Sequence, residues 1–147
     1  MTFWDKTAWL YDIAESLNPK AYRGMLKGIA AVVPDGAKVL DCAAGTGELS
    51  IAAAEKAETG LCTGMPMLEM ARKKCAEKGI RNISFGERDI LHLPDGDNTY
   101  SVSMAGNVLH LLEEPEKAVR ELCRVTKDGG RIIVPTFMAK NSNPLVR

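Results

Sequence analysis

Residues 38–50 contain the residue types and spacing that could do chemistry. The run Lys-Val-Leu-Asp-Cys-Ala-Ala-Gly-Thr-Gly-Glu-Leu-Ser joins an apolar stretch ending at Asp41 to a helix-forming stretch beginning at Glu48. Gly45 and Gly47 predict a tight turn that a ligand can approach closely, because glycine has no side chain to obstruct it. In an open α/β sheet, this turn at the carboxyl end of the first strand is the usual ligand cradle. The dipole and N–H groups of the next helix favour a negative group there.

The details of the turn separate it from two common nucleotide-binding motifs. A dinucleotide fingerprint requires a third glycine, and Ser50 occupies that position. A phosphate-binding P-loop requires Lys followed by Ser or Thr, and Glu48 and Leu49 follow the second glycine instead. The sequence therefore disfavours a nicotinamide-dependent oxidoreductase and a P-loop enzyme.

The run Asp-x-Ala-Ala-Gly-Thr-Gly closely resembles motif I of the class I S-adenosylmethionine-dependent methyltransferases. The nearest group is that of the small-molecule methyltransferases related to the ubiquinone/menaquinone-biosynthesis C-methyltransferases. The resemblance implies that this motif holds the amino-acid end of S-adenosylmethionine, through Asp41, Ala43, Gly45, Thr46 and Gly47.

An aromatic-rich segment precedes this core. Its pattern Trp-Asp-x-x-Ala-x-x-Tyr-Asp is similar to an element that packs over the cofactor pocket in the same group. By that resemblance Tyr11 reaches the methionine end of the cofactor. The alternative is that the aromatic side chains simply cover the edge of the sheet.

The region that should bind the ribose departs from the family pattern. Members usually have a strand ending in an acidic residue that accepts hydrogen bonds from both ribose hydroxyls. In the family, a hydroxyl residue and then Met-Leu at a helix start follow this acid. Counting back from Met67 without gaps places Cys62 at the position of the acid and Gly64 at that of the hydroxyl residue. A loop shortened by two residues places Gly64 at the position of the acid instead. Neither supplies a carboxylate, and the loss is worth on the order of 2–3 kcal/mol of cofactor affinity.

The segment Arg-Asp-Ile-Leu-His-Leu-Pro at residues 88–94 resembles the family's Gly-Asp-Ala-x-x-Leu-Pro. The resemblance implies that Asp89 accepts a hydrogen bond from the adenine amino group and that Ile90 packs on the ring. The alternative for Asp89 is a carboxylate that caps its own loop.

The segment Gly-Asn-Val-Leu-His-Leu-Leu at residues 106–112 is similar to the family's Val-Leu-His-His stretch. By that resemblance Asn107 and His110 line the place where cofactor and acceptor meet. His110 is a candidate general base, with orientation or packing as the alternative role. The catalytic residue is otherwise unassigned.

These residues need elements that bring them together. Apolar periodicity and turn signals predict a helix from Asn18-Pro19 to Val32, further helices at 47–57, 66–78 and 115–125, a tight turn at 126–130, and strands at 39–41, 58–62, 82–87, 99–105 and 131–137. This alternation, with right-handed crossovers and short βα loops, predicts a doubly wound parallel sheet with strand order 3-2-1-4-5 and helices on both faces. The resemblance implies that the sheet is a Rossmann-like methyltransferase core. Gly60 weakens the second strand. The serines Ser101 and Ser103 weaken the fourth strand unless their hydroxyls find partners.

We expect residues 1–147 to form one domain, with a helical lead-in at 1–34, an α/β core at 35–137 and a tail at 138–147. The resemblance implies a further helix and an antiparallel strand pair beyond the fifth strand, for which we find no sequence. The fifth strand then becomes an exposed edge. Another copy of the chain covers it in a homodimer, the tail folds over it, or the chain is a fragment.

Composition limits the partners. Lys and Arg total 19, as do Asp and Glu, so the net charge of zero argues against nucleic acid. No apolar run approaches the ~20 residues of a membrane span, and the start does not read as a signal peptide. The four cysteines lack Cys-x-x-Cys spacing and there are two histidines, so we expect no metal site and a cytoplasmic location.

Two functional hypotheses follow. The first is methyl transfer from S-adenosylmethionine to a small-molecule acceptor, with S-adenosylhomocysteine as the product. The second is a non-catalytic or impaired methyltransferase-like scaffold or subunit that binds the cofactor weakly or not at all. The sequence does not specify the acceptor.

Overall fold

The computed structural model describes residues 18–63 and 68–136. Within them lies one five-stranded sheet in the order β3-β2-β1-β4-β5, in which every pairing is parallel. The predicted strand order is therefore confirmed. The elements are α2 (Pro19–Val32), β1 (Ala37–Cys42), α3 (Glu48–Ala54), β2 (Ala57–Thr63), α4 (Leu68–Glu77), β3 (Ile83–Gly86), β4 (Tyr100–Ala105), the 3₁₀ turn η1 (Leu109–Leu111), α5 (Pro115–Val125) and β5 (Thr126–Ile133).

Strand β1 is the centre of the sheet and the point from which the chain winds in both directions. Asp41 near its end pairs with Cys62 of β2 on one side and with Met104 of β4 on the other. The order of strands reverses between β1 and β4, which is the place where ligands bind in open α/β sheets. The loops that follow β1 and β4 leave the sheet side by side at this point.

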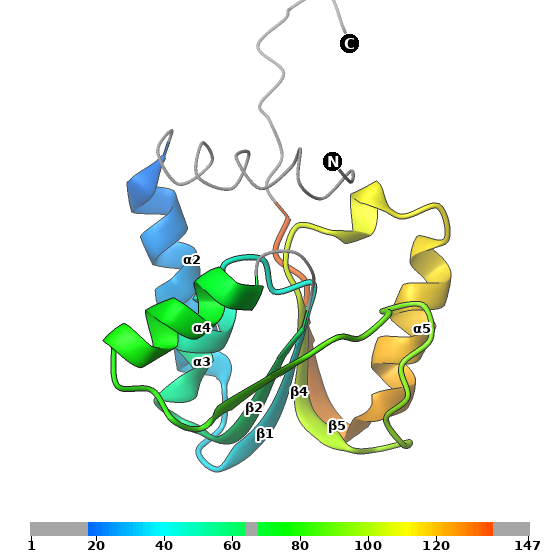
Figure 1. Ribbon diagram of the computed structural model, residues 1–147. Coiled ribbons are helices and arrows are strands. Elements are labelled where there is room, and N and C mark those ends of the chain that lie inside the picture. The colour runs from blue at the N-terminus through cyan, green and yellow to red at the C-terminus, as the bar shows by residue number, and fades with distance from the viewer. Residues whose placement is uncertain (1–17, 64–67, 137–147) are drawn as a thin grey trace, which may run out of the picture.

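Helices cover both faces, as the sequence predicts. Helices α2, α3 and α4 lie on one face and α5 on the other (Figure 1). The α5 side is packed by one buried cluster that includes Leu40 and Leu122, and the α2–α3 side by another that includes Val39 and Val102. Neighbouring residues of β1 therefore serve opposite cores, as the alternation of a strand requires.

The helix boundaries show the local signals expected of them. The Asn18 side chain accepts a hydrogen bond from the Ala21 amide at 3.1 Å, and Pro19 occupies the first helical turn of α2. Gly79 ends α4 in the left-handed region, at φ +69°, and Ile80 N donates to Cys75 O at 2.9 Å. This pair is the usual glycine-terminated helix end. The predicted first residues of this helix at 66–67 lie outside the described residues.

The hydroxyl groups of β4 have partners, which explains how serines fit a central strand. Ser103 is fully buried, and its hydroxyl shares a 2.7 Å hydrogen bond with that of Thr126. The Thr126 hydroxyl in turn donates to Leu122 O at 2.6 Å. Ser101 accepts from the Lys38 amide at 3.2 Å. Satisfied hydroxyls remove the desolvation cost that the bare sequence suggests.

The predicted start of the fifth strand is wrong. Strand β5 begins at Thr126, where the sequence predicted a turn, and ends at Ile133. Tyr100 pairs with Thr126 and Val102 with Arg131, so β4 advances two residues while β5 advances five. Three residues of β5 therefore bulge out, and Gly129 accommodates the bend with φ +74°. The glycine pair makes a bulge inside a strand rather than a turn before one.

Candidate cofactor-binding site

The glycine turn between β1 and α3 has the geometry that its sequence predicts. Ala43, Gly45 and Gly47 all have positive φ, at 55°, 56° and 82°. Gly47 N donates to Ala44 O at 2.9 Å, which closes the turn, and Ile51 N donates back to Gly47 O. A left-handed backbone is strained for a residue with a side chain, so the two glycines avoid at their positions the strain that Ala43 accepts.

Asp41 lies beneath this turn, with 1 % of its surface exposed. The Ser50 hydroxyl, on the first turns of α3, donates to Asp41 Oδ2 at 2.6 Å. Burial raises the pKa of Asp41 to about 7, although hydrogen bonds from Ser50 lower it in part. The bond ties the end of β1 to α3 and so holds the turn between them.

An open hollow lies against the outer side of the turn, at the carboxyl ends of β1 and β4. Asn107 forms part of its wall with φ +51°, and its backbone N–H donates to Pro135 O at 2.7 Å. The described walls leave about 30 Å³ open, room for about two water molecules. The lining residues come from α2, the turn, the start of α3, and the segments after β4 and β5: Tyr22, Met25, Ala43, Ala44, Thr46, Glu48, Leu49, Gly106, Asn107 and Pro135.

Several residues implied by the resemblance meet at this hollow. Ala43, Thr46 and Asn107 line it directly. Gly45 and Gly47 shape the turn from which two of these residues come. Tyr11, which the resemblance places over the same region, lies outside the described residues.

The segment after β3 lies apart from the hollow. Asp89 is exposed, and its Oδ1 accepts from the Leu91 amide at 2.9 Å, the loop-capping contact considered as its alternative role. Ile90 is 8 % exposed and packs in the α5-side cluster with Leu40. His110 is exposed on η1 and does not line the hollow.

The position expected to bind ribose is placed by backbone pairing. Cys62, near the end of β2, pairs with Asp41 of β1 and Phe85 of β3. This position is level with the glycine turn at the carboxyl edge of the sheet. The side chain of Cys62 lies outside the described part of the structure, as does Gly64.

Seven lining residues are not among the site residues expected from the sequence: Tyr22, Met25, Ala44, Glu48, Leu49, Gly106 and Pro135. Tyr22 and Met25 have the helical spacing of a packing face, and these two positions extend that face beyond the sheet to the hollow. Glu48 is held by Lys74 of α4, with Oε1 and Nζ 2.5 Å apart. A carboxylate directly after the glycine turn was the one available signal.

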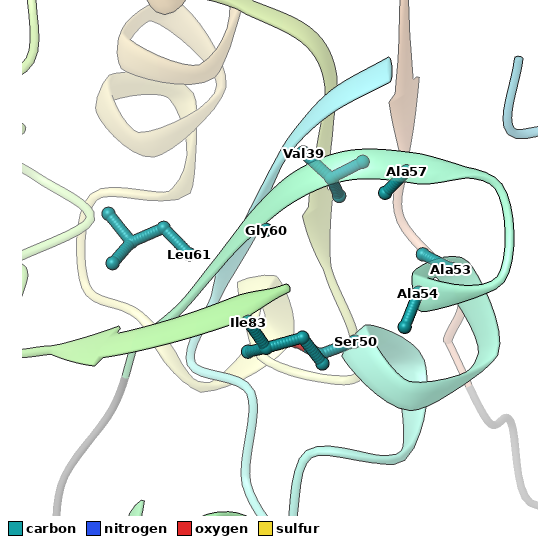
Figure 2. Close-up of a pocket in the computed structure, with 8 residues that line it drawn as sticks. All are labelled: Val39, Ser50, Ala53, Ala54, Ala57, Gly60, Leu61 and Ile83. Carbon is teal, nitrogen blue, oxygen red and sulfur yellow. The ribbon is translucent and has the colours of Figure 1, made fainter. Parts of the chain in front are cut away.

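A second cavity lies behind α3, between that helix and the sheet (Figure 2). Its walls are mostly aliphatic side chains, with Ser50 at one side. The volume of about 10 Å³ corresponds to about one water molecule, so this cavity is a packing space rather than a ligand site.

Residues 18–63 and 68–136 contain neither a cluster of metal ligands nor a membrane-spanning helix. No group of three or more His, Cys, Asp or Glu side chains in these ranges is arranged to hold a metal ion. No helix in the same ranges is both long and apolar enough to cross a membrane.

Comparison with known proteins gives the class that this fold and site define. Residues 34–145 match the sequence pattern of a family described as a methyltransferase domain. The chain belongs to this methyltransferase family, and its sheet has the Rossmann-like fold of the class I S-adenosylmethionine-dependent enzymes.

Among individual relatives, the ubiquinone/menaquinone biosynthesis C-methyltransferase of Bdellovibrio bacteriovorus is 37 % identical over 106 residues, which are 69 % of this chain and 45 % of that protein. The demethylmenaquinone methyltransferase of Paenarthrobacter aurescens is 31 % identical over 148 residues, 99 % of this chain and 56 % of that protein. The chain thus spans about half the length of the curated relatives that it matches. A SAM-dependent methyltransferase from Aquifex aeolicus has the same fold, with a TM-score of 0.68 and 22 % identity over 83 % of this chain and 68 % of its own.

Proposed function

We propose that the chain binds S-adenosylmethionine at the hollow and transfers its methyl group to a small-molecule acceptor. One observation carries the proposal. The left-handed glycine turn and Asn107 wall a single open hollow where the strand order reverses, in a chain of the methyltransferase family. We place the amino-acid end of the cofactor at this hollow, with the turn as its floor.

The residues present fit such a ligand chemically. Thr46 and Glu48 present polar side chains to the hollow, where a hydroxyl and a carboxylate suit an amino-acid tail that carries an ammonium group. Asp89, exposed beyond the end of β3, is the carboxylate that we assign to the adenine amino group. Ile90 packs in the α5-side cluster, so only the small exposed part of its side chain is open to the ring. Product S-adenosylhomocysteine would occupy the same contacts.

The bound cofactor supplies a sulfonium methyl group that is already activated by its positive charge. The chain's part is to hold donor and acceptor in line, which can contribute several kcal/mol to a transfer reaction. We therefore assign the turn and Asn107 to orientation of the donor. We assign no proton-transfer role to His110, because it is exposed on η1 and does not line the hollow.

The names of the relatives suggest where to look for the acceptor. Two of them are quinone-pathway methyltransferases by name. We infer that a demethylated quinone is the first acceptor to test, with transfer to carbon. Tyr22 and Met25 on α2 supply the wall that would face it.

The second candidate is a methyltransferase-like subunit without activity, favoured by Cys62 at the end of β2 where the family pattern has an acid. Calorimetric titration with S-adenosylhomocysteine separates the two. Micromolar binding that is lost in Gly47→Val supports the enzyme, since valine strains the turn. No heat up to millimolar ligand supports the subunit.

A further inference from the structure

A polar cluster joins α5 to the segment between β3 and β4, away from the hollow. At its centre is Arg124, whose Nε and Nη2 donate to the two carboxylate oxygens of Glu121, each at 2.9 Å. The same guanidinium donates to Leu93 O at 2.9 Å and to Asp95 O at 2.8 Å. We call Glu121 and Arg124 the α5 clasp.

The clasp is built to remain ionised. The hydrogen bonds from Arg124 lower the pKa of Glu121 to about 2, and Glu121 and Asp97 raise that of Arg124. A fork-to-fork pair of this kind fixes geometry as well as charge, because both carboxylate oxygens and two guanidinium nitrogens are engaged. The guanidinium also donates to Asp97 Oδ1 at 2.9 Å, and lysine, a point charge, cannot reproduce these five directed bonds.

The clasp holds one end of a short turn, whose Ile90 and Leu93 side chains are also buried in the α5-side cluster. Leu93 is bonded to α5 through both of its backbone groups, since its N–H also donates to Glu121 Oε2 at 2.8 Å. Just before it, Asp89 accepts from the amides of Leu91 and His92, at 2.9 and 3.0 Å. The turn that carries Asp89 and Ile90 thus ends directly on the clasp. Figure 1 shows this green segment running alongside α5.

A second tie fixes the far end of the segment. The Tyr100 hydroxyl donates to Asp95 Oδ1 at 2.8 Å, and Arg88 Nε lies 3.3 Å from Asp95 Oδ2. Arg88 precedes the turn and Asp95 follows it, so this pair closes the base of the loop. The clasp sets the orientation of the loop's outer part relative to α5 together with two other ties, the 2.9 Å contact between His92 Nε2 and Lys117 Nζ and the packing of Ile90 and Leu93 in the α5-side cluster.

We propose that Glu121 and Arg124 are positioning residues for the adenine half of the cofactor, because they hold the Asp89–Leu93 turn at the height where Asp89 meets the adenine amino group. The inference rests on the proposed function of the chain. It adds Glu121 and Arg124 of α5 to the residues that determine adenine binding, although neither touches the ligand. Both lie about 30 positions further along the sequence than the Asp89–Leu93 turn.

The test compares two ligands that differ only at the adenine amino group. S-adenosylhomocysteine carries that group, and S-inosylhomocysteine carries an oxo group in its place. Calorimetry gives the ratio of the two dissociation constants for the wild-type chain, Arg124→Lys, Glu121→Gln and the control Arg120→Lys. Arg120 lies exposed on the same helix. Partial unfolding weakens both ligands equally, so the ratio reports position and not stability.

We expect the wild-type chain and Arg120→Lys to prefer the adenosyl ligand by about tenfold or more, the worth of one charge-assisted hydrogen bond. In Arg124→Lys and Glu121→Gln the preference should fall at least about threefold toward equality. An unchanged preference in both variants overturns the inference and leaves the proposed function standing. Failure of the wild-type chain to bind either ligand removes the proposed function, and the inference with it.

Discussion

Ionisation of the buried Asp41 makes the free energy of unfolding depend on pH. It sits under the glycine turn with Ser50 as its donor, and its pKa of about 7 in the folded chain is above the ordinary value of 3.8. Between these two pKa values the folded chain binds more protons at this site than the unfolded chain does. The stability that Asp41 contributes is therefore present at low pH and is lost as pH rises from about 4 to about 7.

Replacement of Asp41 with Asn removes this titration while keeping a group that accepts from Ser50. We expect the free energy of unfolding of the wild-type chain, relative to Asp41→Asn, to fall by up to about 4 kcal/mol between pH 4 and pH 7. Urea unfolding at several pH values measures it. Parallel pH profiles for the two chains would show that Asp41 titrates normally.

Substitutions at Cys62 test the predicted contact with the ribose. If it occupies the position of the missing acid, Cys62→Asp should tighten S-adenosylhomocysteine binding by roughly 30- to 150-fold, the worth of a charge-assisted pair of hydrogen bonds. Cys62→Asn is the matched uncharged control, and Gly64→Asp tests the shortened-loop alternative. Unchanged affinity in both aspartate variants would mean that neither position contacts the ribose.

At the scale of the elements, β2 contains a glycine that the fold does not need. A Cβ at Gly60 would meet Ile83 Cγ1 at 3.6 Å and Asn82 O at 3.9 Å, both ordinary contacts, beside the cavity of Figure 2. Gly60→Ala should raise the free energy of unfolding by about 0.5–1 kcal/mol, because alanine loses less backbone entropy on folding. A lower denaturant midpoint than wild type would contradict this.

Unlike Gly60, Gly130 in the bulge of β5 has no room for a side chain. A Cβ there would lie 2.7 Å from the carbonyl oxygens of both Lys127 and Ser101. Backbone atoms cannot turn aside as a flexible side chain can, so Gly130→Ala should cost about 1–3 kcal/mol. Chemical denaturation measures the loss. Gly24→Ala on α2 is the control. A Cβ added there would meet no group outside its own helix within 4 Å, so this substitution should not destabilise the chain.

Sequence reasoning predicted the element order well, because each boundary depends on local signals such as Asn18-Pro19 and Gly79. It misplaced β5 because a glycine pair signals a bend equally well within a strand and before one. Only the pairing of Tyr100 with Thr126 shows that the strand has already begun. The partner of Ser103 was hidden for the same reason, since it comes from 23 residues away.

The site was predicted in part. The turn and Asn107 follow from motifs at the ends of β1 and β4, and a parallel sheet brings those ends together. Tyr22 and Met25 could not be separated from core positions, because periodicity gives the face of a helix and not how far that face extends past the sheet. The α5 clasp depends on contacts between segments about 30 residues apart, which no local pattern encodes.

At the scale of the molecule, the two cores share the same strands. Leu40 and Ala105 pack toward α5, while Val39 and Met104 pack toward α2 and α3. Loss of either core exposes the other through β1 and β4. We therefore expect residues 35–137 to unfold as one unit, in keeping with the single domain proposed for the chain. Unfolding as one unit predicts that the thermal transitions seen by circular dichroism and by calorimetry coincide. Two separated transitions would contradict it.

The position of β1 between β2 and β4 has a consequence for synthesis on the ribosome. Strand β4 begins more than fifty residues after β1 ends, so β1 remains half-paired until Ala105 has left the exit tunnel. During that interval its unpaired edge is open to other nascent chains. Chaperone dependence should therefore be greatest for arrested chains that stop short of this residue.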